Sequence, residues 1–346
     1  MNETSPLIKE KAPLILAEIK KASSVLLHCH PLPDPDSTCS ALAMKFALEQ
    51  MGKKATVIRG DSEIPRGFAH FPGIGSIVDK DFSEVGLNDF DLFISLDSGS
   101  RNMVSQEKPP VFPLPIKTIV IDHHATNGNY GEINLVDVSS PATAFILFQL
   151  IKLWEVAITP EIAANLFIGI YTDTGGFKYP PTDWRVLKAA SELAHTAPDF
   201  TDTIFTMENS LSKEAIYFQA IALNSIETFL DDNLAMSSVS NRDLVRKKIP
   251  EDCIRGISIS NILKSVVGWN IGASLIERKP KEIKVSFRTR DSDKYDVSKL
   301  ASALGGGGHR AAAAAVLNMS LEDAKKAVVS KAKELYNLYH YPLTAD

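Results

Sequence analysis

Cysteine is scarce in this sequence, and long apolar runs are missing from it. The three cysteines include no CxxC pair, which argues against a disulfide framework and against a thiolate zinc site. They are Cys29, Cys39 and Cys253. The first hydrophobic stretch is interrupted by Glu18 and Lys20 before it reaches the length of a signal-peptide core or a membrane span. We therefore expect a cytoplasmic protein with no membrane partner.

Two common catalytic motifs are also missing. The chain contains no GxSxG segment, which would place a nucleophilic serine on a sharp turn, and no GxxxxGK[ST] phosphate-binding loop. Neither sign of charge is in large excess, because 37 Lys and Arg residues face 42 Asp and Glu residues. A net charge of −5 excludes a polycation that coats nucleic acid, so any phosphate-rich partner must be bound locally.

The 346 residues are enough for two domains, and 45% hydrophobic content is enough for their cores. Up to about Leu230, short apolar runs alternate with amphipathic helical stretches, a rhythm typical of an α/β layer on a mostly parallel sheet. The composition changes at residues 231–233. We predict a catalytic domain at 1–190, a helical linker at 191–232 and a smaller α/β domain at 233–346. Strands are predicted at 24–30, 54–59, 92–97 and 117–122, and helices near 37–51, 142–153, 161–171, 184–195 and 212–230.

Residues that bind hard metal ions gather at the ends of three predicted strands and one predicted helix. They are His30, Asp34, Asp36, Asp97, Asp122, His123, His124 and Asp173. Imidazole and carboxylate without thiolate suit Mn²⁺ or Mg²⁺ better than structural zinc. Two such ions about 3.5 to 4 Å apart can clamp both oxygens of a phosphoryl displacement. A single Asp after a strand is usually only a cap or turn residue, so the ordered set carries the prediction.

A second candidate site lies in the run Gly305 to Gly308, which is followed by His309 and Arg310. Successive glycines can place backbone N–H groups around an anion without hindrance from side chains. The alternative for the glycines alone is a flexible turn. Arg288 and Arg290 are separated by Thr289 in VSFRTR, so on a strand the two arginines share a face.

These segments resemble a known family. HPLPDPDS, SLDSGS, DHHATN and YTDTGG, in this order, are similar to the four motifs of DHH-family phosphoesterases. SFRTR and GGGGH resemble the phosphate-binding part of the DHH-associated C-terminal domain found in nanoRNases and RecJ-type exonucleases. The chain departs from the usual first motif at Leu32, where the family has Asn, and at Pro35, where it has Gly, and from the usual glycine-containing run after GGGGH in RAAAAAV.

The resemblance implies roles for these residues. One Mn²⁺ would be bound by His30, Asp34 and Asp97. The other would be bound by Asp36, Asp97, His123 and Asp173, with Asp97 bridging and Mg²⁺ as a possible substitute. The catalytic set would be Asp97, Asp122, His123 and His124, with Asp122 orienting an imidazole and His124 facing the phosphate. Substrate would be bound by Arg288, Gly306, Gly307, Gly308, His309 and Arg310.

The function that the resemblance implies is a Mn²⁺-dependent phosphodiesterase that degrades short oligoribonucleotides to 5′-mononucleotides. Removal of the 3′-phosphate from 3′-phosphoadenosine 5′-phosphate is a companion activity, and the active site is expected in the cleft between the two domains. The partners would be short RNA or small nucleotides, and a homodimer is left open. Two alternatives stay open as well. One is hydrolysis of cyclic or linear dinucleotides such as c-di-AMP or pApA, and the other is a nucleotide-binding regulator without turnover.

Overall fold

The computed structural model describes residues 4–255 and 257–338. These residues form two compact units, which divide between Ser210 and Leu211. The first unit contains a five-stranded sheet in the order β2-β1-β3-β4-β5, with every neighbouring pair parallel. Its strands are β1 (Ser24–His28), β2 (Lys54–Ile58), β3 (Leu92–Leu96), β4 (Lys117–Asp122) and β5 (Ile133–Val136). Its helices are α1 (Pro6–Lys21), α2 (Pro35–Gln50), α3 (Thr143–Leu153), α4 (Pro160–Asp173), α5 (Trp184–Thr196) and α6 (Phe200–Glu208). The predicted α/β class with a parallel sheet is confirmed.

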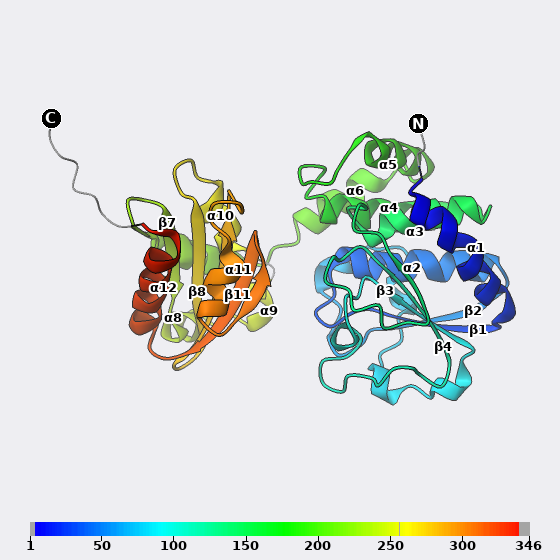
Figure 1. The fold of residues 1–346 in the computed structure, drawn as a ribbon, viewed down its shortest axis with the longest axis horizontal. Helices are drawn as coiled ribbons and strands as arrows, with labels where there is room; N and C mark the ends of the chain where they lie inside the picture. The colour runs from blue at the N-terminus through cyan, green and yellow to red at the C-terminus, as the bar shows by residue number, and fades with distance from the viewer. Residues whose placement is uncertain (1–3, 256, 339–346) are drawn as a thin grey trace, which may run out of the picture. The chain divides into compact units, whose positions relative to one another are not determined.

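The two faces of this sheet are covered differently. Val25 and Leu27 of β1 point to a face on which α1 to α5 pack, and they lie in the main core of the unit. Leu26 points to the other face, where Phe93 and short 3-10 turns close a smaller core. Figure 1 shows α1 to α4 on one side of the strands and the short cyan turns on the other. This alternation follows from the period of two along each strand.

α2 is buried along its first half because its residues there are small. Five consecutive residues, Ser37 to Ala41, are all fully buried. Small side chains let α3 and α4 approach closely, so three helices meet directly beneath the carboxyl edge of the sheet. The Asp34 carboxylate caps the start of α2 by accepting a hydrogen bond from the Ser37 N–H, and Pro35 occupies the first turn, where its missing N–H costs nothing.

The second unit contains a six-stranded mixed sheet in the order β10-β11-β9-β8-β7-β6. Its strands are β6 (Glu227–Phe229), β7 (Leu234–Val239), β8 (Ile271–Lys279), β9 (Glu282–Thr289), β10 (Gly307–His309) and β11 (Ala312–Asn318). Its helices are α7 (Lys213–Asn224), α8 (Asn241–Arg246), α9 (Glu251–Arg255), α10 (Ile259–Ser265), α11 (Val297–Ala303) and α12 (Leu321–Tyr336). α11 and α12 pack on one face, and α7 to α10 pack on the other. No helix in the described part of the chain is long and apolar enough to cross a membrane.

The units meet in sequence at Ser210, inside the segment predicted as a helical linker. Phe200 of α6 packs on the core of the first unit, whereas Phe218 of α7 lies in a core of the second. The helix expected over 212–230 ends at Asn224, and β6 follows it. The composition change at 231–233 is the turn between β6 and β7, in which Asp231 and Asp232 have positive φ angles.

Candidate metal centre

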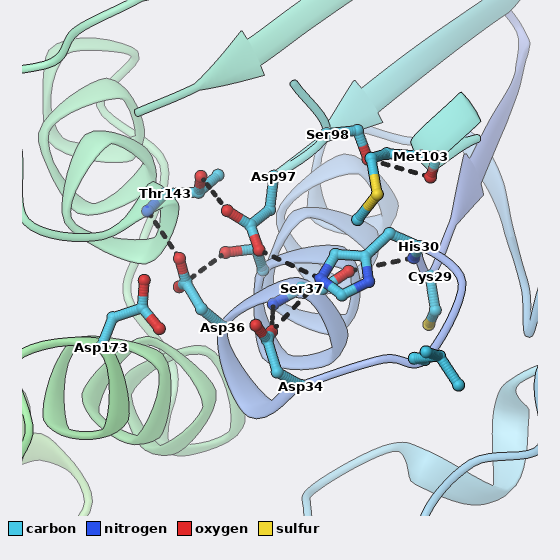
Figure 2. A network of polar contacts seen from close by, with 12 residues as sticks. Cys29, His30, Asp34, Asp36, Ser37, Asp97, Ser98, Met103, Thr143 and Asp173 are labelled. Carbon is cyan, nitrogen blue, oxygen red and sulfur yellow. Dashed lines mark hydrogen bonds and ion pairs between the residues drawn. The ribbon is translucent and has the colours of Figure 1, made fainter. Parts of the chain in front are cut away.

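Three neighbouring strands and two helix ends deliver the predicted metal-binding residues to one edge of the parallel sheet. His30 follows β1, Asp97 follows β3, and the run Asp122-His123-His124 begins at the last residue of β4. Asp34 and Asp36 lie at the start of α2, and Asp173 is the last residue of α4. Parallel strands present their carboxyl ends at the same edge, which is where open α/β sheets bind ligands. Figure 2 shows four of the aspartates and His30 turned toward one another. The structure therefore brings the whole predicted set together.

Asp97 is the centre of this arrangement. Its side chain is 1% exposed, and its two oxygens face different partners. Oδ1 lies 3.4 Å from His123 Nε2, while Oδ2 lies 3.6 Å from His30 Nε2. Its φ angle is +53°, an uncommon backbone conformation for a residue with a side chain and one that concentrates at functional sites. One carboxylate thus borders two separate groups of potential ligands.

The first group consists of His30, Asp34 and Asp97, whose ligand atoms lie within 4.8 Å of one another. His30 Nε2 is 3.5 Å from Asp34 Oδ1. The Pro31 carbonyl lies 3.0 Å from His30 Nδ1 and accepts a hydrogen bond from it, which leaves Nε2 to act as a ligand. Burial opposes protonation of His30, but the Asp34 and Asp97 carboxylates outweigh it and raise its pKa to about 11.

The second group consists of Asp36, His123 and Asp173, again within 4.8 Å. His123 Nε2 lies 3.2 Å from Asp173 Oδ2, yet it is buried and makes no hydrogen bond among the described residues. Burial lowers the tendency of His123 to be protonated, but Asp173 and Asp97 outweigh it and raise its pKa to about 11. His123 Nε2 is thus a buried nitrogen that lies near the carboxylates of Asp97 and Asp173 and makes no hydrogen bond among the described residues. Such a nitrogen is suited to bind a metal ion.

The buried carboxylates act on one another electrostatically. Burial, followed by the charges of Asp97 and Asp173, raises the pKa of Asp36 well above its ordinary value. Burial also raises the pKa of Asp173, which is partly opposed by His123. For Asp97, burial is outweighed by His123 and His30, which lower its pKa. A divalent cation would relieve this repulsion, and the donor set of imidazole nitrogen and carboxylate oxygen fits such an ion.

Asp122 organises the DHH segment, and together with Asp97, His123 and His124 it forms a third group whose possible ligand atoms lie within 4.8 Å of one another. Its Oδ1 accepts hydrogen bonds from the His123 N–H and from His124 Nδ1, each at 2.8 Å. Its Oδ2 accepts one from Asn127 Nδ2 at 2.6 Å. Asp122 is fully buried, whereas the His124 side chain is 40% exposed. The loop therefore presents His124 to solvent in a defined orientation.

Sequence reasoning missed two contributors to this edge. Thr143 and Ala144, at the start of α3, donate hydrogen bonds to Asp36, and Thr143 also donates one to Asp97. The available signal was weak. α3 begins after Ala142, which has no side chain able to cap it, so a cap from elsewhere in the fold was needed.

The predicted substrate residues lie in the second unit. Arg288 of β9 pairs with Ala312 of β11, which in turn pairs with His309 of β10, so Arg288 and His309 share one row and one face of the sheet. The Arg290 guanidinium instead donates to the carbonyls of Ser265 and Val266 at the end of α10.

The glycine run beside them is exposed, and so is Arg310. Arg310 lies 3.1 Å from Asp293 Oδ1 and 3.5 Å from Asp296 Oδ2, and it donates to the Ser292 carbonyl. Arg310 therefore contacts acidic groups of its own domain.

Comparison with known proteins defines the class. Residues 24–170 match the family model described as the DHH family, N-terminal domain. Residues 254–337 match the family model of the DHHA1 domain. The chain therefore carries a DHH domain followed by a DHHA1 domain. With this pair of domains and a His–Asp centre able to hold metal, it is a metal-dependent hydrolase related to the DHH phosphoesterases.

The chain is also similar along most of its length to individual proteins. The chain is 28% identical over 341 residues to the bifunctional oligoribonuclease and PAP phosphatase NrnA of Thermus thermophilus, covering 96% of this chain and 97% of that protein. It is 23% identical to the Bacillus subtilis protein of the same name, and the match covers 87% of this chain and 91% of that protein. The crystal structure of an exopolyphosphatase-related protein from Bacteroides fragilis has the same fold, with a TM-score of 0.85, 22% identity and coverage of 95% and 97%.

Proposed function

We propose that this protein degrades short oligoribonucleotides to 5′-mononucleotides and also removes the 3′-phosphate from 3′-phosphoadenosine 5′-phosphate. The observation that carries the proposal is Asp97, whose two oxygens border two separate groups of histidine and carboxylate ligands. The likeness to oligoribonucleases over nearly the whole chain supports the substrate class. The proposed substrates are intracellular nucleotides, so a cytoplasmic location belongs to the proposal, and a homodimer stays a prediction.

We assign two Mn²⁺ ions to the centre. His30, Asp34 and Asp97 would hold the first. The second would be held by Asp36, His123 and Asp173, joined by Asp97, whose Oδ1 lies 3.4 Å from His123 Nε2. Mg²⁺ suits the carboxylates but is a weaker match for imidazole nitrogen, so we expect Mn²⁺ to support the higher rate. When bound, such a pair supplies a hydroxide near neutral pH and neutralises charge that develops on the phosphoryl oxygens.

The side chains around the centre have separate tasks. With one oxygen directed at each group of ligands, Asp97 would be shared by both ions and would hold the two groups at a fixed separation. Asp122 accepts a hydrogen bond from His124 Nδ1, which fixes the ring so that Nε2 can donate to a phosphate oxygen. The partial exposure of His124 suits a residue that touches substrate. No residue of this set is needed as a covalent nucleophile.

The second domain would bind a substrate phosphate. Arg288 and His309 lie in one row with only Ala312 between them, so both can contact one anion resting on that face. Gly306, Gly307 and Gly308 bring exposed backbone next to this row. Arg310 is the weakest member of the proposed set, because it already contacts Asp293 and Asp296.

The test is a Mn²⁺-dependent time course on end-labelled RNA of two to about twenty nucleotides, with 3′-phosphoadenosine 5′-phosphate and cyclic di-AMP as parallel substrates. We expect the shortest RNAs to disappear first and the phosphatase reaction to occur with the same metal. Asp97→Ala should abolish both reactions, while Asp202→Ala, which changes an exposed aspartate of α6, should not.

Two results would contradict the proposal. Cleavage of cyclic di-AMP alone would point to a dinucleotide phosphodiesterase that uses the same centre. Metal binding with no turnover of any substrate would favour a nucleotide-binding regulator.

A further inference from the structure

The first turn of α3 contacts two of the carboxylates in the metal centre. The Thr143 N–H donates to Asp36 Oδ2 at 2.7 Å, and the Ala144 N–H donates to Asp36 Oδ1 at 3.0 Å. The Thr143 hydroxyl donates to Asp97 Oδ1 at 3.0 Å. Thr143 and Asp36 are fully buried, and Asp97 is 1% exposed. Figure 2 shows Thr143 with one dashed contact to each aspartate.

This contact satisfies needs on both sides. The first N–H groups of a helix have no partner within the helix, and Ala142 at the cap position has no side-chain acceptor. Asp36 is a buried carboxylate, which is costly unless donors surround it. The carboxylate of α2 therefore caps α3, and its orientation is set before any metal arrives. The Ser40 hydroxyl also donates to Asp36 Oδ1, at 3.4 Å, so Oδ2 is the oxygen that keeps a further lone pair for a metal ion.

A third helix closes on the same point. A Cβ atom on Gly169 of α4 would lie 2.7 Å from Asp36 Oδ1 and 2.7 Å from the Ala144 side chain. Glycine at this position therefore lets α4 touch the start of α3. Asp173 stands four residues further along, at the last position of α4. The spacing between Asp173 and Asp36 thus depends on the absence of a side chain at Gly169.

We propose that Thr143 is a positioning residue of the metal centre, where its hydroxyl holds Asp97 so that one oxygen faces each group of ligands. Thr143 binds Asp97 Oδ1, the oxygen that borders His123. Rotation of the carboxylate about its terminal bond would break this hydrogen bond, so Oδ2 stays directed at His30. Thr143 does not touch the reacting atoms. The inference rests on the proposed binding of divalent cations at this centre.

Loss of the hydroxyl should weaken binding of divalent cations, because partners of metal ligands typically contribute about 10- to 100-fold to affinity. The substitution Thr143→Val keeps the branched shape and removes the donor, while Thr143→Ser keeps the donor. Thr118→Val is a matched control, because Thr118 is a buried threonine at the opposite end of β4 from Asp122. Thr143→Ala gives a second variant without the hydroxyl if the valine variant does not fold.

The experiment titrates Mn²⁺ into metal-free protein without substrate and follows free Mn²⁺ by electron paramagnetic resonance. Thermal unfolding of each metal-free variant reports whether it is folded. We expect Thr143→Val to raise the dissociation constant at least about 10-fold, and Thr143→Ser and Thr118→Val to stay within about 3-fold of wild type. Rescue by serine separates a hydrogen bond to Asp97 from a general packing role.

Wild-type affinity in a folded Thr143→Val or Thr143→Ala protein would overturn the inference, whatever the enzyme hydrolyses. A wild-type protein that binds Mn²⁺ but leaves short RNA intact would overturn the proposed function only, since the threonine comparison needs no substrate. A wild-type protein that binds no Mn²⁺ would overturn both.

Discussion

The run Gly305 to Gly308 contains glycines that the fold requires and one that it does not, and substitution by alanine should separate them. A Cβ on Gly306 would lie 2.1 Å from the Ala314 carbonyl oxygen, and a Cβ on Gly308 would lie 2.5 Å from Ala313 Cα. Both obstacles are backbone atoms of the neighbouring strand. Gly308 also has a φ angle of +142°. Gly307, in contrast, has no atom within 4 Å of its ideal Cβ and no positive φ angle.

These distances translate into stability. Forcing a methyl group into a closed contact costs about 1 to 3 kcal/mol, and strain from a positive φ angle adds about 1 kcal/mol more at Gly308. For a domain of this size, about 2 kcal/mol lowers the melting temperature by roughly 7 °C. Gly306→Ala and Gly308→Ala should therefore destabilise the second unit. Gly307→Ala should change its stability by less than about 0.5 kcal/mol.

Gly307→Ala, the variant that should keep its stability, is the one whose effect on activity tests substrate binding. If backbone at Gly307 meets the substrate phosphate, an added methyl group should raise KM about tenfold, equivalent to about 1.4 kcal/mol, with little change in kcat. The assay combines thermal unfolding with steady-state kinetics on a short RNA. A marked loss of stability in Gly307→Ala would refute the geometric reasoning. Unchanged KM in that variant would show that Gly307 does not contact substrate.

Three further predictions concern the first unit. Asp97→Asn should weaken Mn²⁺ binding by at least about 100-fold at both positions, because a bridging charge is lost, and a titration that finds one site with normal affinity would contradict the bridge. Metal binding should release protons and strengthen as pH rises from 6 to 8, because carboxylates raise the pKa of His30 and His123 to about 11 in the metal-free protein and bound imidazole must be neutral. Calorimetry in buffers of different ionisation enthalpy measures the protons, and identical heats would count against this assignment. Leu32→Asn should stabilise the protein by about 0.5 kcal/mol, because asparagine tolerates a positive φ angle better than leucine does. Leu32 has a φ angle of +58°, and its side chain is 52% exposed. A lower melting temperature of this variant would contradict the prediction.

Much of the first unit could be predicted from the sequence. The four strands expected at 24–30, 54–59, 92–97 and 117–122 all form, within two residues at their ends. Their apolar runs and the helices between them are local patterns, and local patterns are what periodicity detects. The order of the polar residues after these strands also indicated one common edge, because parallel strands end on the same side.

Other elements had too little local signal. β5 is a strand of four residues at the edge of the sheet, and its burial is only partial, so no strong apolar run marks it. The helix expected to extend to Leu230 ends at Asn224, because residues 227–229 pair with β7. That pairing is a tertiary contact, and it overrides a helical pattern in the sequence.

The candidate centre divides in the same way. The sequence alone determined which residues gather at the edge, since His30, Asp97 and the DHH segment each follow a recognisable strand. Only the tertiary structure decided how they are held. Thr143 and Asp36 are 107 positions apart, and no local pattern records a hydrogen bond between them. The orientation of Asp97 depends on that distant helix start, because a carboxylate turns freely until a donor from another element fixes it.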